Sequence, residues 1–269
     1  MFLLGPRGTG KTTLLEKLTS ELGREYVYIN LEYDGEMREF MESCAQKHGS
    51  SDLFLSVAER LGIAPEASGK VLFIFDDLEY SPMIVSSLLG TDLRENLILA
   101  SDLATNEIMT LAERCERVSL STLDFGGFLE ETGHQWYREV IEAHFQKKKK
   151  IPEMIHSDIL DCYEDFLQTG GMPQSVAAYK ASGADGVRHA QRMIKNDLSQ
   201  GLNSLKDESL RGRTEAVMSS LADQALNTRF NFCEIRKGTS FGFYREAIKL
   251  LERSGIAIRI DSKGKGFEL

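Results

Sequence analysis

Apolar and polar residues alternate in blocks over the first 123 residues of the chain. Short apolar runs of the kind found in strands buried on both faces occupy residues 71–75 and 97–100, and residues 2–4, 26–31 and 118–123 are further strand candidates. The stretches between them place apolar residues at helical spacing, as in 12–23, and we expect one or two helices in 35–68. This alternation predicts an α/β fold, with a parallel five-stranded sheet that carries helices on both faces.

The strand pattern stops after this point. Residues 124–226 contain amphipathic helical segments separated by glycines. The chain then continues with a short helix, a helix over 239–255 and a hairpin whose tip is DSKGKG (261–266). We therefore expect three parts: a core at 1–125, a helical lid region at 126–213 and a small winged-helix-like unit at 214–269.

The composition is that of an ordinary globular protein, with 42% apolar residues and a single Trp among 269 residues. The four cysteines are scattered and form no CxxC pair, so we expect reduced thiols in place of disulfides or a metal site. No apolar run approaches the ~20 residues that a membrane span needs. The sequence therefore predicts a cytoplasmic protein without a membrane partner.

Charge is distributed unevenly along the chain. The formal net charge is −9, yet residues 227–269 hold nine Lys or Arg against five Asp or Glu. The overall acidity argues against a protein whose whole surface binds nucleic acid. It leaves the C-terminal segment as the candidate for binding an anionic partner.

The strongest chemical signal is GPRGTGKT at residues 5–12. It matches the phosphate-binding loop G-x-x-x-x-G-K-[ST] and lies between a predicted strand and a predicted helix. Its glycines let backbone N–H groups point at phosphate oxygens, Lys11 reaches the β- and γ-phosphates, and the Thr12 hydroxyl can bind Mg²⁺. The predicted nucleotide-binding residues are Gly5, Pro6, Arg7, Gly8, Thr9, Gly10, Lys11, Thr12 and Thr13.

A second signal is VLFIFDDLEY at residues 71–80, where a buried strand ends in acidic residues. With the phosphate loop upstream, Asp76 is expected to hold Mg²⁺ and not merely to cap a helix. Asp77 stands where most ATPases of this kind have a Glu that orients the attacking water, and its carboxylate ends about 1.5 Å short. We therefore expect Asp77 to act in slow hydrolysis, with Glu79 as its rival.

A third candidate follows the apolar run of LILASD (97–102), another predicted strand that ends in a small polar residue. Ser101 is expected to hydrogen-bond the γ-phosphate or the attacking water, as the polar residue of the neighbouring strand does in many such ATPases.

The phosphate loop, the acidic strand and the strand of Ser101 together resemble the AAA-type division of P-loop ATPases. Two later segments, RVSLSTLDFGGFLE (117–130) and LQTGGMPQSVAAY (167–179), resemble motifs of a bacterial and archaeal group of AAA-family ATP-binding proteins. The resemblance covers nearly the whole chain and implies ATP and Mg²⁺ as cofactors. It also implies a C-terminal domain of unknown function that begins with a winged-helix-like unit and continues into a nuclease-like fold.

The chain departs from that group in two places. Members usually have a helix before the first strand, whereas here Met1 lies only four residues before Gly5. The chain also ends at KGKGFEL, where members continue into the nuclease-like part. The resemblance therefore predicts a fragment or a shortened member, and it gives no support for a nuclease activity.

Two arginines also match the group's motifs. Arg117 precedes the last predicted strand. It is expected to contact the γ-phosphate of its own chain or to serve a neighbouring subunit as an arginine finger, with a surface arginine near a helix end as the equally weighted alternative. Arg7 matches within the phosphate loop, and the resemblance assigns it no role.

The C-terminal unit leaves two alternatives open. In a winged helix that binds DNA, the helix over 240–254 would be the recognition helix, with Ser240, Tyr244, Arg245 and Lys249 near the groove. Alternatively, the unit serves only for protein docking or packing.

The sequence thus predicts a Mg²⁺-dependent ATP-binding protein whose slow ATP hydrolysis switches the position of the C-terminal unit. The alternative is a nucleotide-gated regulator that binds DNA or protein through residues 227–269 with negligible turnover. A kinase acting on a small substrate is disfavoured, and an oligomer is compatible with the sequence.

Overall fold

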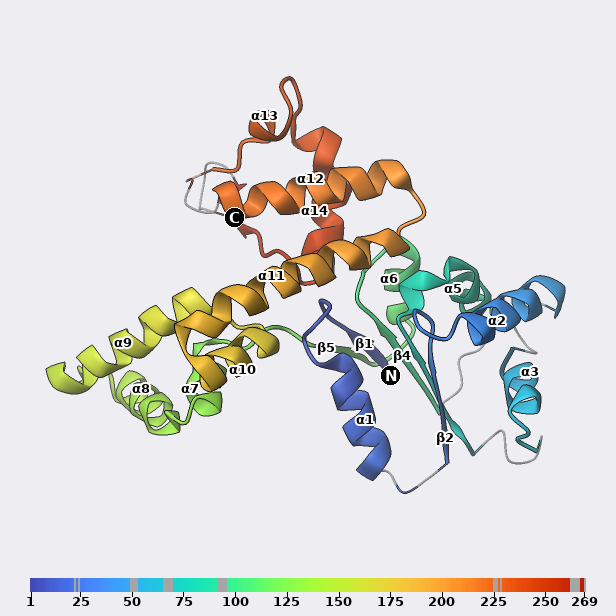
Figure 1. The fold of residues 1–269 in the computed structure, drawn as a ribbon, viewed down its shortest axis with the longest axis horizontal. Helices are drawn as coiled ribbons and strands as arrows, with labels where there is room; N and C mark the ends of the chain where they lie inside the picture. The colour runs from blue at the N-terminus through green and yellow to red at the C-terminus, as the bar shows by residue number, and fades with distance from the viewer. Residues whose placement is uncertain are drawn as a thin grey trace. The chain divides into compact units, whose positions relative to one another are not determined.

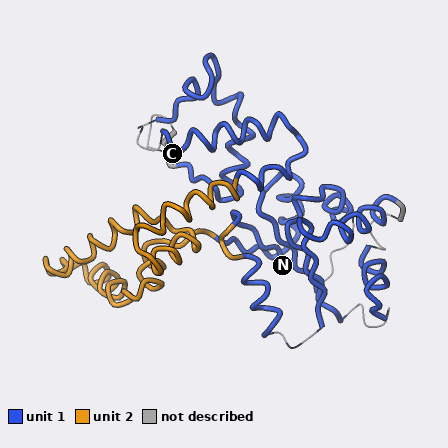
Figure 2. The backbone as a smooth tube through the Cα atoms, viewed as in Figure 1, with its two compact units in different colours: residues 1–7, 11–120, 199–269 blue, residues 8–10, 121–198 orange. Residues whose placement is uncertain are grey.

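The computed structural model (Figure 1) describes residues 1–21, 23, 25–48, 53–64, 70–90, 96–224, 227, 229–261 and 267–268. The chain forms two compact units, which Figure 2 colours separately. The first comprises residues 1–7, 11–120 and 199–269, and the second comprises residues 8–10 and 121–198. The C-terminal residues therefore belong to the same compact unit as the sheet, whereas the sequence pattern predicts a separate part there.

The first unit is built on a five-stranded parallel sheet, as predicted. Its strands are β1 (Phe2–Leu4), β2 (Tyr26–Asn30), β3 (Leu72–Asp76), β4 (Leu97–Ser101) and β5 (Arg117–Ser119). Their order across the sheet is β2-β3-β4-β1-β5. The last strand is shorter than predicted, because it ends at Ser119. Since all strands are parallel, the phosphate loop after β1, the acids after β3 and Ser101 of β4 reach the same carboxyl edge.

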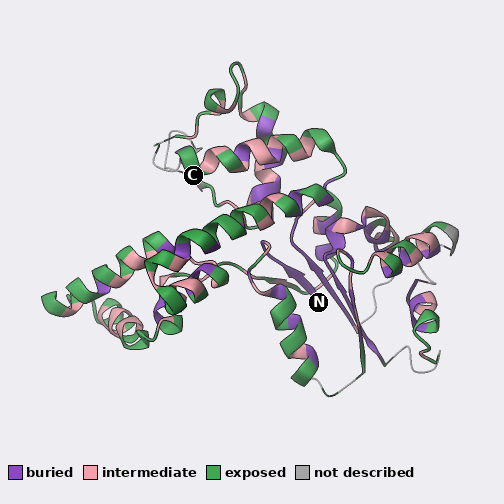
Figure 3. Ribbon diagram, in the orientation of Figure 1, coloured by how far each residue is buried: buried purple, intermediate pink, exposed green. Residues whose placement is uncertain are grey.

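Alternate residues of the strands face two separate apolar layers, which is why the strands read as continuous apolar runs. Phe73 and Phe75 point into the larger layer, and Leu72 and Ile74 into the smaller one. The larger layer is covered by α2 (Gly35–His48), α3 (Leu53–Arg60), α5 (Pro82–Leu89) and α6 (Asn106–Ala112), and the smaller by α1 (Lys11–Glu21). Figure 3 shows the resulting continuous burial of the central strands.

The C-terminal elements follow in the predicted order of helix, short helix, helix and hairpin. They are α12 (Glu208–Gln224), α13 (Phe232–Ile235), α14 (Phe241–Arg253), β6 (Ile260–Asp261) and β7 (Phe267–Glu268), preceded by the 3₁₀ turn η3 (Leu202–Ser204). The strands β6 and β7 pair antiparallel. The predicted wing tip at 262–266, with Lys263 and Lys265, lies outside the described residues.

Helix α14 requires one correction. Tyr244, predicted near a DNA groove, is only 2% exposed and packs with Val217, Ala247 and Leu251. Tyr244 shares one helical face with Ala247 and Leu251, at spacings of three and seven residues, and this apolar face is the one that packs inward. Tyr244 is therefore a core residue, whereas Ser240 and Arg245 are exposed.

The regular secondary structure in the described residues of the second unit is entirely helical. It contains α7 (Phe125–Glu131), α8 (Gln135–Lys147), α9 (Glu153–Thr169), α10 (Pro173–Ser182) and most of α11 (Ala184–Gly201). Phe128 centres its packing, with ring centroids 5.5 Å from both Phe166 and Tyr179. The backbone N–H of Leu123 donates to the carbonyl of Gly171 at 2.8 Å, so the two motif segments after residue 117 meet here.

None of the helices in the described part of the chain has the length and hydrophobicity that a bilayer crossing requires. The four cysteines are free thiols.

Candidate nucleotide-binding site

The phosphate loop takes its shape from its glycines. Gly8 and Gly10 have φ angles of 85° and 93°, in the left-handed region that favours glycine. At Gly5 any Cβ would collide with the backbone carbonyl of Leu120. Helix α1 then begins at Lys11, which leaves its first backbone N–H groups directed toward the loop. The loop therefore has the geometry expected of a phosphate cradle.

Lys11 is buried and fully engaged. Its side chain is 4% exposed, and its Nζ donates to the carbonyl oxygens of Gly5 at 2.8 Å and Pro6 at 3.1 Å. The ammonium also forms an ion pair with Asp102. The residue after Ser101 thus joins the site, although the sequence pattern points only to Ser101.

Thr12 and Asp76 lie side by side, as a shared metal ion would require. Thr12 Oγ1 donates to Asp76 Oδ2 at 3.0 Å, and the Tyr28 hydroxyl donates to the same oxygen at 2.7 Å. Burial raises the pKa of Tyr28, and the Asp76 carboxylate adds to the rise. A hydroxyl and a carboxylate at this distance are hard oxygen ligands that fit Mg²⁺.

Asp77 follows β3 in an unusual conformation. Its φ of 56° is in the left-handed region, which is uncommon for a residue other than glycine. Asn30 Nδ2 donates to Asp77 Oδ2 at 2.8 Å. Burial raises the pKa of the Asp77 carboxyl to about 7, and the carboxylates of Asp76 and Asp102 add to the rise.

Glu79 lies close to Asp77, but its carboxylate is already bonded. It is part of the 3₁₀ turn η2 (Leu78–Tyr80) and is 4% exposed. Ser101 Oγ donates to Glu79 Oε2 at 2.6 Å, and the backbone N–H of Asp102 donates to both Glu79 oxygens at 3.2 Å. Burial raises the pKa of Glu79 well above its usual range.

Three carboxylates therefore converge at this edge. Oxygens of Asp77, Glu79 and Asp102 lie within 4.8 Å of one another. Burial raises the pKa of Asp102 as well, and the neighbouring Lys11 limits that rise. Burying a group of acids costs free energy unless cations or protons compensate their charge. Lys11 supplies one such cation through its ion pair with Asp102.

Arg7 connects the loop to the end of β2. Its guanidinium donates to Glu32 Oε2 at 2.7 Å, to the Tyr33 hydroxyl at 3.1 Å and to the Tyr80 hydroxyl at 3.3 Å. It also lies 4.0 Å from Asp102. Sequence reasoning missed Glu32 and Tyr80, because nothing in their local pattern distinguishes them from surface residues.

Arg117 is not brought to this site. It opens β5 opposite Phe2, the first residue of β1, whereas the phosphate loop follows Leu4, the last residue of β1. Arg117 therefore lies at the opposite edge of the sheet, with its side chain exposed. A contact with the γ-phosphate in its own chain does not fit this placement, and the role of an arginine finger for a neighbouring subunit stays a prediction.

C-terminal elements reach the phosphate loop and the end of β4. A Cβ at Gly255 would lie 3.3 Å from Pro6 Cδ, and the backbone N–H of Ala104 donates to Ser254 Oγ at 2.9 Å. Leu103 packs in an apolar cluster with Leu202, Leu205 and Leu250. The residues directly after Asp102 are therefore fastened to α14 and η3.

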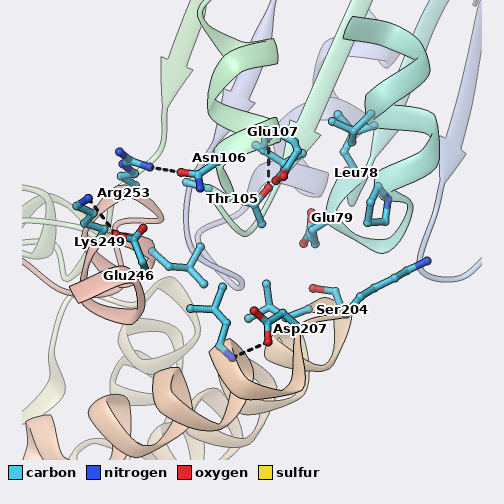
Figure 4. Close-up of a pocket in the computed structure, with 18 of the residues that line it drawn as sticks. Leu78, Glu79, Thr105, Asn106, Glu107, Ser204, Asp207, Glu246, Lys249 and Arg253 are labelled. Atoms are coloured by element: carbon cyan, nitrogen blue, oxygen red, sulfur yellow. Dashed lines mark hydrogen bonds and ion pairs between the residues drawn. The ribbon is translucent and has the colours of Figure 1, made fainter. Parts of the chain in front are cut away.

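The first unit has a cleft of about 470 Å³, and Glu79 is one of the residues that line it. Figure 4 shows Glu79 and Thr105 on one side of it, with Ser204 and Asp207 on the other. Glu79 thus lies between Ser101 of the sheet and a space that the C-terminal elements help to line.

Comparison with known families assigns the two halves differently. Residues 1–129 match a family described as an AAA domain, and residues 160–265 match a domain of unknown function (DUF8612). A comparison with curated proteins gave no significant match. Together with the five-stranded parallel sheet, the first match identifies an AAA-type, P-loop NTPase-like domain at the N-terminus, which implies nucleotide binding.

Proposed function

We propose that this AAA-type domain binds ATP together with Mg²⁺, hydrolyses ATP slowly, and sets the position of the C-terminal elements by its nucleotide state. One observation carries the proposal. Thr12 Oγ1 lies 3.0 Å from Asp76 Oδ2, across 64 residues of sequence. The phosphate loop and the acidic strand therefore present two oxygen ligands together, beside the Lys11 ammonium.

Each residue then has a role in placing charge around the γ-phosphate. Lys11 contacts the β- and γ-phosphates, while Thr12 and Asp76 hold Mg²⁺, whose charge offsets that of the phosphates. Asp77 orients the attacking water and accepts its proton. A carboxyl whose pKa is about 7 suits that task at neutral pH.

Two features favour slow turnover. The Asp77 side chain is one methylene shorter than the usual Glu, and a misplacement near 1 Å can cost on the order of 10²-fold in rate. The hydrogen bond from Asn30 also competes with water for the Asp77 carboxylate. Glu79 is the weaker candidate, because Ser101 and the Asp102 N–H already occupy its oxygens.

The proposed switch rests on the contacts after β4. Leu103 packs against η3 and α14, Ala104 bonds Ser254, and Gly255 adjoins Pro6. A shift of the phosphate loop or of the end of β4 would therefore displace the C-terminal elements through these contacts. This is the physical basis on which a nucleotide could control them.

Mg·ATP binding and phosphate release by the purified protein test the proposal. Removing Lys11 alone would deprive the buried Asp102 of its principal ionic partner and destabilise the fold. The informative comparison is therefore Lys11→Ala/Asp102→Ala against Asp102→Ala. We expect the double variant to bind Mg·ATP about 10- to 100-fold more weakly and to release no phosphate, as for the loss of a charged hydrogen bond. Equal binding by the two variants would show that the site is assigned wrongly.

A further inference from the structure

The ammonium of Lys11 has three N–H donors, and all three are in use. Gly5 and Pro6 accept through backbone carbonyls that belong to the loop itself. The third partner, Asp102, is a side chain from a different strand end. A phosphate oxygen can reach the ammonium only if one of these partners withdraws, and a side chain can move with the least disturbance of the loop.

Asp102 and a nucleotide phosphate compete for the same cation. Both are anionic, and Asp102 is only 5% exposed, so little water screens their mutual repulsion. Its other near neighbours include the carboxylates of Asp77 and Glu79, within 4.8 Å. Within the described part of the chain, the second cation close to Asp102 is Arg7, at 4.0 Å.

We propose that Asp102 is a positioning residue. It pairs with the Lys11 ammonium in the nucleotide-free protein and releases it to a phosphate oxygen when nucleotide binds. The displaced carboxylate turns toward Arg7, whose present partner is Glu32. This inference rests on the proposed nucleotide binding and deepens it, because the Asp102 carboxylate neutralises Lys11 before nucleotide binds and so lowers the affinity of the site for phosphate.

The same displacement offers a route to the C-terminal elements. Asp102 is followed directly by Leu103, in the cluster with Leu202 and Leu250, and by Ala104, bonded to Ser254. A backbone adjustment at Asp102 therefore acts on residues that already hold α14. Nucleotide binding and the position of the C-terminal elements are coupled through one side chain in this proposal.

Isothermal titration with Mg·ATP, together with thermal unfolding of the nucleotide-free protein, tests the role of Asp102. In Asp102→Asn we expect affinity for Mg·ATP to increase about tenfold, the effect of one charged hydrogen bond on an equilibrium constant. The Tm without nucleotide should fall, because Lys11 loses its ionic partner. A purely structural residue would lower both quantities, so the opposite signs are diagnostic.

Three further variants serve as controls. Asp102→Ser should tighten binding like Asp102→Asn, and it replaces that variant if the latter does not fold. Asp102→Glu keeps the charge and should keep affinity near that of the wild type. Glu107→Gln makes the same charge change at an exposed position of α6 and should leave affinity unchanged.

The outcomes separate the two proposals. A wild type that binds Mg·ATP, with equal or weaker binding by Asp102→Asn and Asp102→Ser, overturns the role of Asp102 and leaves the nucleotide site standing. Binding by the neutral variants but not by the wild type supports the role strongly. Absence of binding by the wild type and by every variant overturns both proposals.

Discussion

The carboxyl edge of the sheet and helix α14 differ in how far their charged side chains are buried. At the edge, Lys11, Asp76 and Asp102 are each at most 5% exposed, and they are held by ion pairs and hydrogen bonds. On α14 the buried positions are Tyr244, Ala247, Leu250 and Leu251, and the charged side chains are exposed or half-buried.

Buried and exposed charges contribute differently to the stability of the protein. Burying a charge costs several kcal/mol, and pairing often returns no net gain, so the buried charges of this edge are weak evidence for a role in stability. Surface charges such as Arg245 cost little and contribute little to stability. They are suited to weak, salt-sensitive contacts. The predictions below test each side of this comparison.

The largest effect is expected at Asp77. A general base contributes about 10²- to 10⁴-fold to a rate, so Asp77→Asn should reduce single-turnover ATP hydrolysis by that factor while Mg·ATP binding persists. Asp77→Glu should hydrolyse faster than the wild type, because it restores the missing methylene. Glu79→Gln is the matched control and should change the rate little, since Glu79 is bonded to Ser101.

The roles of the two acids could also be reversed. Wild-type turnover by Asp77→Asn, combined with an inactive Glu79→Gln, would assign the water to Glu79. A wild type that never turns over, with no variant differing from it, would make the protein a nucleotide binder only.

The second effect tests whether α14 is held by its apolar face. Tyr244→Ala removes a ring that is 2% exposed and should lower the free energy of unfolding by about 3–5 kcal/mol. Phe243→Ala, one residue earlier and 44% exposed, should cost only about 1 kcal/mol, chiefly through its contact with Arg213. Denaturant unfolding of both variants measures the difference. Similar losses would mean that the two faces of α14 are not distinguished by burial.

The smallest effect concerns the surface charges. If the C-terminal elements bind DNA, affinity should fall steeply with salt, and replacing Arg245, Lys249, Lys263 and Lys265 by Gln should reduce the slope of log K against log salt by about 3–4. Replacing Lys147–Lys150 by Gln removes the same charge from the second unit and should leave the slope unchanged. A folded wild type that does not bind DNA even at low salt would favour protein docking.

The sequence predicts much of the sheet because its central strands β1, β3 and β4 are buried on both faces. The runs FLL, VLFIF and LILA are apolar without interruption. The phosphate loop follows the first and Asp76 the second, and a parallel sheet brings these strand ends to one edge. These features depend on local pattern and on one rule of topology. They are accordingly the part of the site that sequence reasoning anticipates.

The rest depends on which strands become neighbours. Lys11 meets Asp102 because β1 pairs with β4, with Leu4 opposite Ser101, and no local pattern specifies that pairing. The place of Arg117 is likewise set by its register with Phe2, which no local pattern specifies. Tyr244 was misplaced because a tyrosine carries both an apolar ring and a polar hydroxyl, and only the packing places its ring with Ala247 and Leu251.

The contact between Gly255 and Pro6 limits which fragments of the protein can keep the phosphate loop intact. The AAA-domain match ends at residue 129, yet Pro6 lies against Gly255 and Leu103 packs in a cluster with Leu202 and Leu250. A fragment stopped at the end of the match would turn Leu103 toward water and leave the phosphate loop without one wall. A piece that carries an intact loop therefore needs residues beyond 200 as well as those of the family match.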